Sequence, residues 1–119
     1  MREQDPRLRL SVNGNVTIIE LLDRKILDGV NILQIGEQLS ALVAQANAPK
    51  FVLDFTNVAH LSSSTLGVLI TLSKRVREKA GQLRLCGIQP AILEIFVITR
   101  LNEIFQICSS REEAVKSFV

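Results

Sequence analysis

The sequence has 119 residues, a hydrophobic content of 47% and a formal net charge of +2. This length and composition fit one folded domain, spanning residues 1–119, and exclude a disordered chain. The small net charge and the absence of Trp and Tyr argue against a nucleic-acid partner. No apolar run reaches the roughly 20 residues of a membrane span, so we expect none.

The first elements form the pattern of a β-hairpin. Residues 8–12 alternate apolar and polar side chains, and residues 16–21 are again strand-like. Asn13-Gly14-Asn15 lies between them, and Asn-Gly is a strong hairpin signal. We therefore predict an antiparallel strand at a sheet edge, with residues 1–7 as a flexible tail.

A helix is predicted next, from about Asn31 to Ala46. Apolar residues recur there at helical spacing, and Asn31 with Gln34 resembles a capping box. Residues 51–55 are almost wholly apolar, as in a central strand buried on both faces.

A polar loop and turn, residues 56–65, leads into a second predicted helix that ends near Ala80. Gly81 is placed to end it in a left-handed conformation. Basic residues cluster on the helix opposite its apolar stripe and are interpreted as a solvated face. These are Lys74, Arg75, Arg77 and Lys79.

The last third of the chain repeats the alternation of strands and helices. Residues 82–86 form a strand, Pro90 opens a third helix, and residues 104–108 form the fifth strand. Ser110 with Glu113 is a capping box for a short last helix. The order β-β-α-β-α-β-α-β-α predicts an α/β fold with a mixed, mostly parallel five-stranded sheet and about four helices.

The sequence argues against catalysis. It has no Gly-rich phosphate loop, no Cys/His metal cluster and only one histidine, His60. Cys86 and Cys108 lie in apolar strands and are interpreted as buried free thiols. Because the N-terminus also lacks a secretion signal, we expect a cytoplasmic, non-enzymatic protein with no cofactor and no metal. Nucleotide binding is a weaker alternative, since no P-loop lysine is present.

Four hydroxyl residues, Ser62-Ser63-Ser64-Thr65, stand where a buried strand leads into a helix. One of them is expected to cap the helix. A cap needs one hydroxyl, however, and a helix N-terminus also stabilises an anion. Phosphorylation is therefore a second interpretation of this segment.

Residues 54–69 resemble the signature of STAS domains, in particular the bacterial anti-sigma-factor antagonists. The resemblance rests on Asp54-Phe55-Thr56 and on Ser62-Ser63-Ser64-Thr65-Leu66-Gly67. It extends over nearly the whole chain, through Ile26-Leu27-Asp28, residues 85–90 and residues 101–114.

This resemblance implies a protein that binds an anti-sigma factor with serine kinase activity and is switched by phosphorylation. A phosphatase, of PP2C type, would reset the switch. The implied phosphoacceptor is Ser63, with Ser64 as the alternative. The implied partner-binding residues are Asp28, Thr56, Ser62, Ser64, Thr65, Leu66 and Gly67.

The sequence departs from the family pattern near the implied acceptor. Ser62 replaces the usual Asp, Thr65 replaces the usual Gly, and Arg100 stands where Gly is frequent. These departures leave a second hypothesis open. In it, the domain is an unphosphorylated scaffold or an accessory subunit of a signalling complex or transporter.

Overall fold

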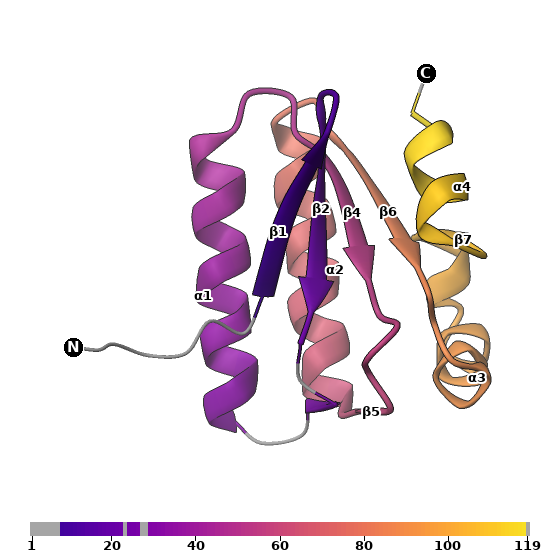
Figure 1. Ribbon diagram of the computed structural model, residues 1–119. Helices are drawn as coiled ribbons and strands as arrows, with labels where there is room; N and C mark the ends of the chain where they lie inside the picture. Colours follow the sequence, from indigo (N-terminus) through magenta and orange to yellow (C-terminus); the bar gives the residue numbers. More distant parts are fainter. Residues whose placement is uncertain (1–7, 23, 27–28, 119) are drawn as a thin grey trace.

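A computed structural model describes residues 8–22, 24–26 and 29–118 of the chain (Figure 1). Five strands form one sheet in the order β1-β2-β4-β6-β7. Their bounds are β1 Leu8–Asn13, β2 Val16–Leu21, β4 Lys50–Asp54, β6 Gln82–Cys86 and β7 Gln106–Cys108. Two shorter strands, β3 (Lys25–Ile26) and β5 (His60–Leu61), pair with each other in parallel.

The helices alternate with the strands. They are α1 Gly29–Gln45, α2 Ser63–Glu78, α3 Pro90–Ile98 and α4 Arg111–Lys116, with a 3-10 turn, η1, at Leu101–Glu103. β1 pairs antiparallel with β2, and the other neighbours in the large sheet are parallel. The predicted α/β class, the hairpin at Gly14 and the mostly parallel five-stranded sheet are therefore confirmed. Within the described ranges, no helix has both the length and the hydropathy of a membrane-spanning segment.

Two apolar layers cover the two faces of the sheet, because neighbouring residues of a strand point to opposite sides. In β4, Leu53 packs into the larger core with α1, α2 and α3. Val52 packs into the smaller core with α4. Asp54 follows Val52 in the alternation and therefore lies on the α4 side. Figure 1 shows α1 and α2 running side by side, away from α4.

Several predicted boundaries were wrong. The first helix begins at Gly29, so Asn31 stands inside it and the predicted capping box does not precede it. The second helix begins at Ser63 rather than after Thr65. The fifth strand begins at Gln106 rather than at residue 104, because the preceding residues form η1 and its C-cap, Ile104.

The end of α2 also differs from the prediction. Ala80, with φ of +59°, adopts the left-handed conformation, and Gly81 does not. Gly81 is instead required by a close approach, since an added Cβ would lie 2.4 Å from the Pro49 carbonyl oxygen. Of the capping box predicted for the last helix, the Ser110 cap is confirmed, because the Glu113 N–H donates to Ser110 Oγ at 3.1 Å. The Glu113 carboxylate reaches back one residue further than predicted and accepts from the Ser109 N–H at 3.1 Å.

Candidate functional site

The start of α2 uses two of the four hydroxyl residues for its own structure. Ser62 is the N-cap, and its Oγ accepts from the Thr65 N–H at 3.4 Å. Its Oγ also lies 3.2 Å from Thr65 Oγ1. Thr65 is 3% exposed. The cap predicted from the sequence is therefore Ser62, and the buried Thr65 contacts the Ser62 hydroxyl from the core side.

Ser63 and Ser64 occupy the first two positions of α2, and both are exposed. Backbone N–H groups at these positions have no preceding helical turn to accept from them. No acidic residue stands in the first turn of the helix. An anion placed here would meet the positive end of the helix dipole without a competing carboxylate.

The remaining predicted site residues divide into exposed and buried groups. Thr56 and Gly67 are exposed, whereas Leu66 is 7% exposed and packs in the core. A Cβ added to Gly67 would meet nothing within 4 Å. Asp28 lies outside the described residues.

Asp54, the first residue of the matched motif, is buried and has charged and polar partners. Arg111 donates to Asp54 Oδ2 from Nη2 at 2.6 Å and from Nε at 2.9 Å. The Thr56 N–H donates to Asp54 Oδ1 at 2.9 Å, and the Thr56 hydroxyl donates to the same oxygen. Burial alone would raise the pKa of Asp54, but the hydrogen bonds from Thr56 and Arg111 outweigh it and lower that pKa.

This network fixes the loop that leads from β4 toward α2. Gly87 lies against it with φ of +70°, and an added Cβ would lie 2.5 Å from Thr56 Oγ1. The hydroxyl of Thr56 therefore has a structural partner, although the residue is exposed. Arg111 was not predicted as a partner of Asp54, because it lies 57 residues away in the sequence and its position looks like an ordinary helix start.

The two cysteines are confirmed as buried free thiols. Burial, followed by the nearby Asp54 carboxylate, raises the pKa of Cys86 to about 12. Cys86 is therefore held as a neutral thiol. No group of three or more His, Cys, Asp or Glu side chains is arranged to hold a metal among the residues that the structure describes.

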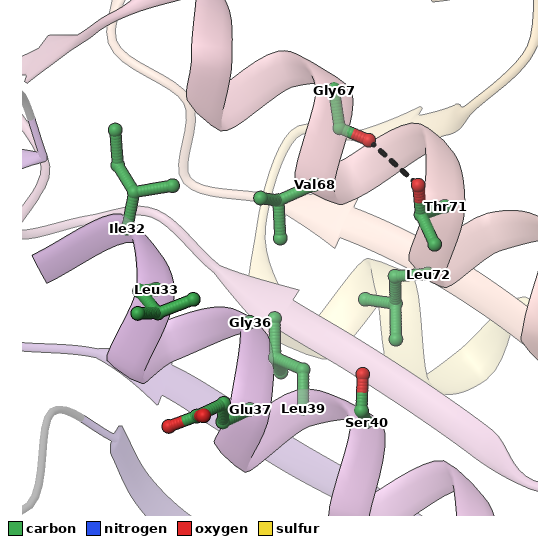
Figure 2. Close-up of a pocket in the computed structure, with 10 residues that line it drawn as sticks. All are labelled: Ile32, Leu33, Gly36, Glu37, Leu39, Ser40, Gly67, Val68, Thr71 and Leu72. Carbon is green, nitrogen blue, oxygen red and sulfur yellow. Dashed lines mark hydrogen bonds between the residues drawn. The ribbon is translucent and has the colours of Figure 1, made fainter. Parts of the chain in front are cut away.

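A groove between α1 and α2 begins close to the exposed serines. Figure 2 shows Val68 and Leu72 of α2 directed toward α1. The groove has a volume of about 680 Å³. Its lining is mainly apolar, with Glu37, Ser40 and Thr71 as polar members. Gly67 lies at its α2 edge, one helical turn after Ser63, so the groove continues the surface that carries Ser63.

Comparison with known proteins matches this chain to one domain family. The family model for the STAS domain matches residues 7–114. A protein named as the anti-sigma factor antagonist BtrV, from Bordetella bronchiseptica, is 31% identical over 93 residues, which are 78% of this chain and 79% of BtrV.

Solved structures have the same fold. The structure of an anti-sigma-factor antagonist (STAS) domain protein from Planctomyces limnophilus has a TM-score of 0.83 at 23% identity, covering 94% of this chain and 97% of that one. The Bacillus protein SpoIIAA in its phosphorylated form has a TM-score of 0.67 at 19% identity, covering 92% of this chain and 96% of that one.

Proposed function

This chain belongs to the STAS domain family, and from that premise we propose that it is an anti-sigma factor antagonist switched by serine phosphorylation. In this proposal, it binds an anti-sigma factor that carries serine kinase activity. Phosphorylation of Ser63 by that partner ends the binding. A phosphatase of PP2C type restores the binding form. The likeness to BtrV supports the antagonist assignment.

The exposure of Ser63 beside an apolar groove carries this proposal. Ser62 is engaged as the helix cap and Thr65 is buried, whereas Ser63 and Ser64 are exposed. The hydroxyl of Ser63 makes no hydrogen bond to another described residue. Ser63 is therefore available to a kinase without the loss of a structural contact, and Ser64 is the neighbouring alternative.

The physics of the helix start supports a switch that acts on binding and leaves the fold intact. A phosphoryl group adds about two negative charges at neutral pH. The N-terminus of α2 stabilises such a charge. A partner surface packed over Ser63 would have to desolvate the same charge, which is costly without a cationic partner. Phosphorylation would therefore weaken docking more than folding.

The docking surface in this proposal is narrower than the set of residues that the resemblance implies. Thr56, Ser64 and Gly67 are exposed, and in this proposal they contact the partner. Ser62, Thr65 and Leu66 would act indirectly, because they cap the helix or pack beneath it.

The proposal is tested by incubating the protein with ATP and the histidine-kinase-like anti-sigma factor encoded in the same genome. Mass spectrometry of the intact protein and its peptides should then find one phosphoryl group on Ser63. Ser63→Ala should abolish it, and Ser64→Ala should not. A phosphoryl group on Ser64 in the wild type would show that Ser64, and not Ser63, is the acceptor. If no phosphoryl group is found on residues 62–65, the proposed phosphorylation switch is wrong.

A second candidate function is a scaffold subunit that is never phosphorylated. The apolar residues exposed on and after α3 favour it, since single-partner binding at α2 does not explain them. They are Leu93, Val97, Ile98 and Ile104. Size-exclusion chromatography with light scattering discriminates the two, because a scaffold is expected to assemble and a switch to remain monomeric until it meets its partner.

A further inference from the structure

The groove beside Gly67 is followed by a second hollow toward the C-terminal ends of the two helices. This second hollow, with a volume of about 560 Å³, is lined by residues of α1 and α2. The two hollows share Ser40 and Thr71 in their linings, so they adjoin each other, and together they are called the channel. On α1 the lining runs from Ile32 to Ala44, which is about 18 Å at the rise of a helix.

The two halves of this channel differ in polarity. The half near Ser63 is mainly apolar and includes Leu33, which is 64% exposed, and Val68, with Glu37 as its one charged lining residue. The other half contains the exposed cations Lys74 and Arg75, and cations outnumber its single carboxylate, Glu78. Neither cation has an ion-pair partner among the described residues. The nearby Lys79 is already engaged, because its Nζ donates to the Ala44 and Ala46 carbonyl oxygens at 3.1 and 3.2 Å.

Glycine on each helix lets another chain approach the apolar half closely. Gly67 has open space where a side chain would stand, and Gly36 on α1 faces only Val68 at ordinary van der Waals distance. Neither glycine has a positive φ. Glycine inside a helix costs up to about 1 kcal/mol relative to alanine. Among the residues that the structure describes, no packing contact explains that cost at Gly67.

We propose that this channel receives an amphipathic helix of the anti-sigma factor, with its apolar stripe in the half near Ser63 and acidic residues over Lys74 and Arg75. The inference rests on the proposed function and names the segment of the partner that the site takes. An open channel between two helices fits a helix laid into it better than a small ligand, which needs enclosure. Its length accommodates about three helical turns.

A partner-independent test uses two synthetic helical peptides of 16 residues with the same leucine stripe. One carries three glutamates at one end, and the control carries three lysines there. With isotope-labelled protein, the acidic peptide should shift the amide signals of Gly36, Ser40, Gly67 and Thr71. It should bind at least about tenfold more tightly than the basic one at low salt. Equal affinities, shifts confined to α3 or no binding at millimolar peptide would overturn the inference.

Substitutions along the channel test whether the acidic peptide binds there, and melting curves show whether each variant is folded. Leu33→Glu and the double charge reversal Lys74→Glu with Arg75→Glu should each weaken acidic-peptide binding by about tenfold. The matched controls are Ile98→Glu, at a residue of similar exposure on α3, and Lys116→Glu on α4. Both controls should leave the affinity for the acidic peptide unchanged. Circular-dichroism melting curves check that each variant folds.

The same variants, tested with the anti-sigma factor, separate this inference from the proposed function. If the wild-type protein is phosphorylated on Ser63 but the channel variants bind the partner as tightly as the controls do, only the channel inference fails. If the wild type neither binds the anti-sigma factor nor is phosphorylated, the proposed function fails, and the peptide experiment still decides whether the channel takes an acidic amphipathic helix.

Discussion

The hydroxyl oxygens of Ser62 and Thr65 lie 3.2 Å apart at the start of α2, where Ser62 also caps the helix. These are two of the three positions at which the sequence departs from the pattern of antagonist STAS domains, the third being Arg100. The two departures therefore meet in one contact, and the neutral hydroxyl of Ser62 performs the capping that a carboxylate could also perform.

Loss of the Ser62 cap should destabilise the domain. Ser62→Ala is expected to lower the free energy of unfolding by about 1 kcal/mol, because the Thr65 N–H loses its side-chain acceptor and keeps only the Ser62 carbonyl oxygen, at 3.1 Å. Ser62→Asp should retain the cap and gain from the helix dipole. Urea denaturation measures both, with the exposed Ser64→Ala as the control. A Ser62→Ala variant as stable as the control would contradict the capping role.

Gly67 should show opposite effects on folding and on binding. Gly67→Ala is expected to stabilise the folded domain by about 0.5–1 kcal/mol, since the added methyl group meets no atom and alanine favours the helix. The same change should weaken anti-sigma factor binding, measured by calorimetry, because it fills the open edge of the channel.

Gly81→Ala is the matched control for Gly67→Ala. An added Cβ at Gly81 clashes with Pro49, so this variant should be destabilised. If Gly67→Ala binds the partner as tightly as the wild type does, the partner does not approach the α2 backbone at Gly67.

Arg111 should stabilise the domain in a pH-dependent way. Arg111→Met removes both donors to Asp54 Oδ2, and we expect a loss of about 2 kcal/mol near neutral pH, since Arg111 is itself partly exposed. The pKa of Asp54 is lowered from its ordinary value of 3.8, so its carboxylate contributes stability above that value. This contribution is lost as the pH falls through the lower folded-state pKa.

In Arg111→Met, the pKa of Asp54 should be higher than in the wild type. The loss of stability as the pH falls from about 5 through 3.8 and below should therefore be smaller in the variant. Urea midpoints measured across that range test this. Parallel pH profiles for the wild type and the variant would show that Arg111 does not hold the charge of Asp54.

The cysteines should be unreactive in the folded protein. Cys86 is fully buried, and burial raises its pKa to about 12, so almost no thiolate is present near pH 8. We expect a thiol reagent such as Ellman's reagent to label Cys86 only after denaturant is added. Rapid labelling of Cys86 in the native state would mean that α4 opens readily from the sheet.

The elements that the sequence predicted correctly depend on local patterns. The Asn13-Gly14 turn and the Ser110–Glu113 cap each depend on residues within four positions of each other. The pairing of β3 with β5 was missed, because each has two residues and their partners lie 35 positions apart. Such pairing leaves no periodicity in the sequence.

The candidate site was predictable only in part for the same reason. The hydroxyl-rich segment can be recognised in the sequence because its four residues are consecutive. Which of these hydroxyls are exposed depends on the residue at which α2 begins. Arg111 reaches Asp54 only through the packing of α4 on the sheet. The channel needs the relative placement of α1 and α2, which side-chain patterns along either helix do not encode.

The most direct test of the switch is a comparison of the affinity of the anti-sigma factor for the unphosphorylated protein and for protein phosphorylated on Ser63. Isothermal titration calorimetry on the two purified forms, with Ser63→Ala as a binding-competent control, measures it. We predict that the phosphorylated form binds at least about tenfold more weakly, while its circular-dichroism spectrum and melting temperature stay close to those of the unphosphorylated form. Equal affinities of the two forms would contradict the account.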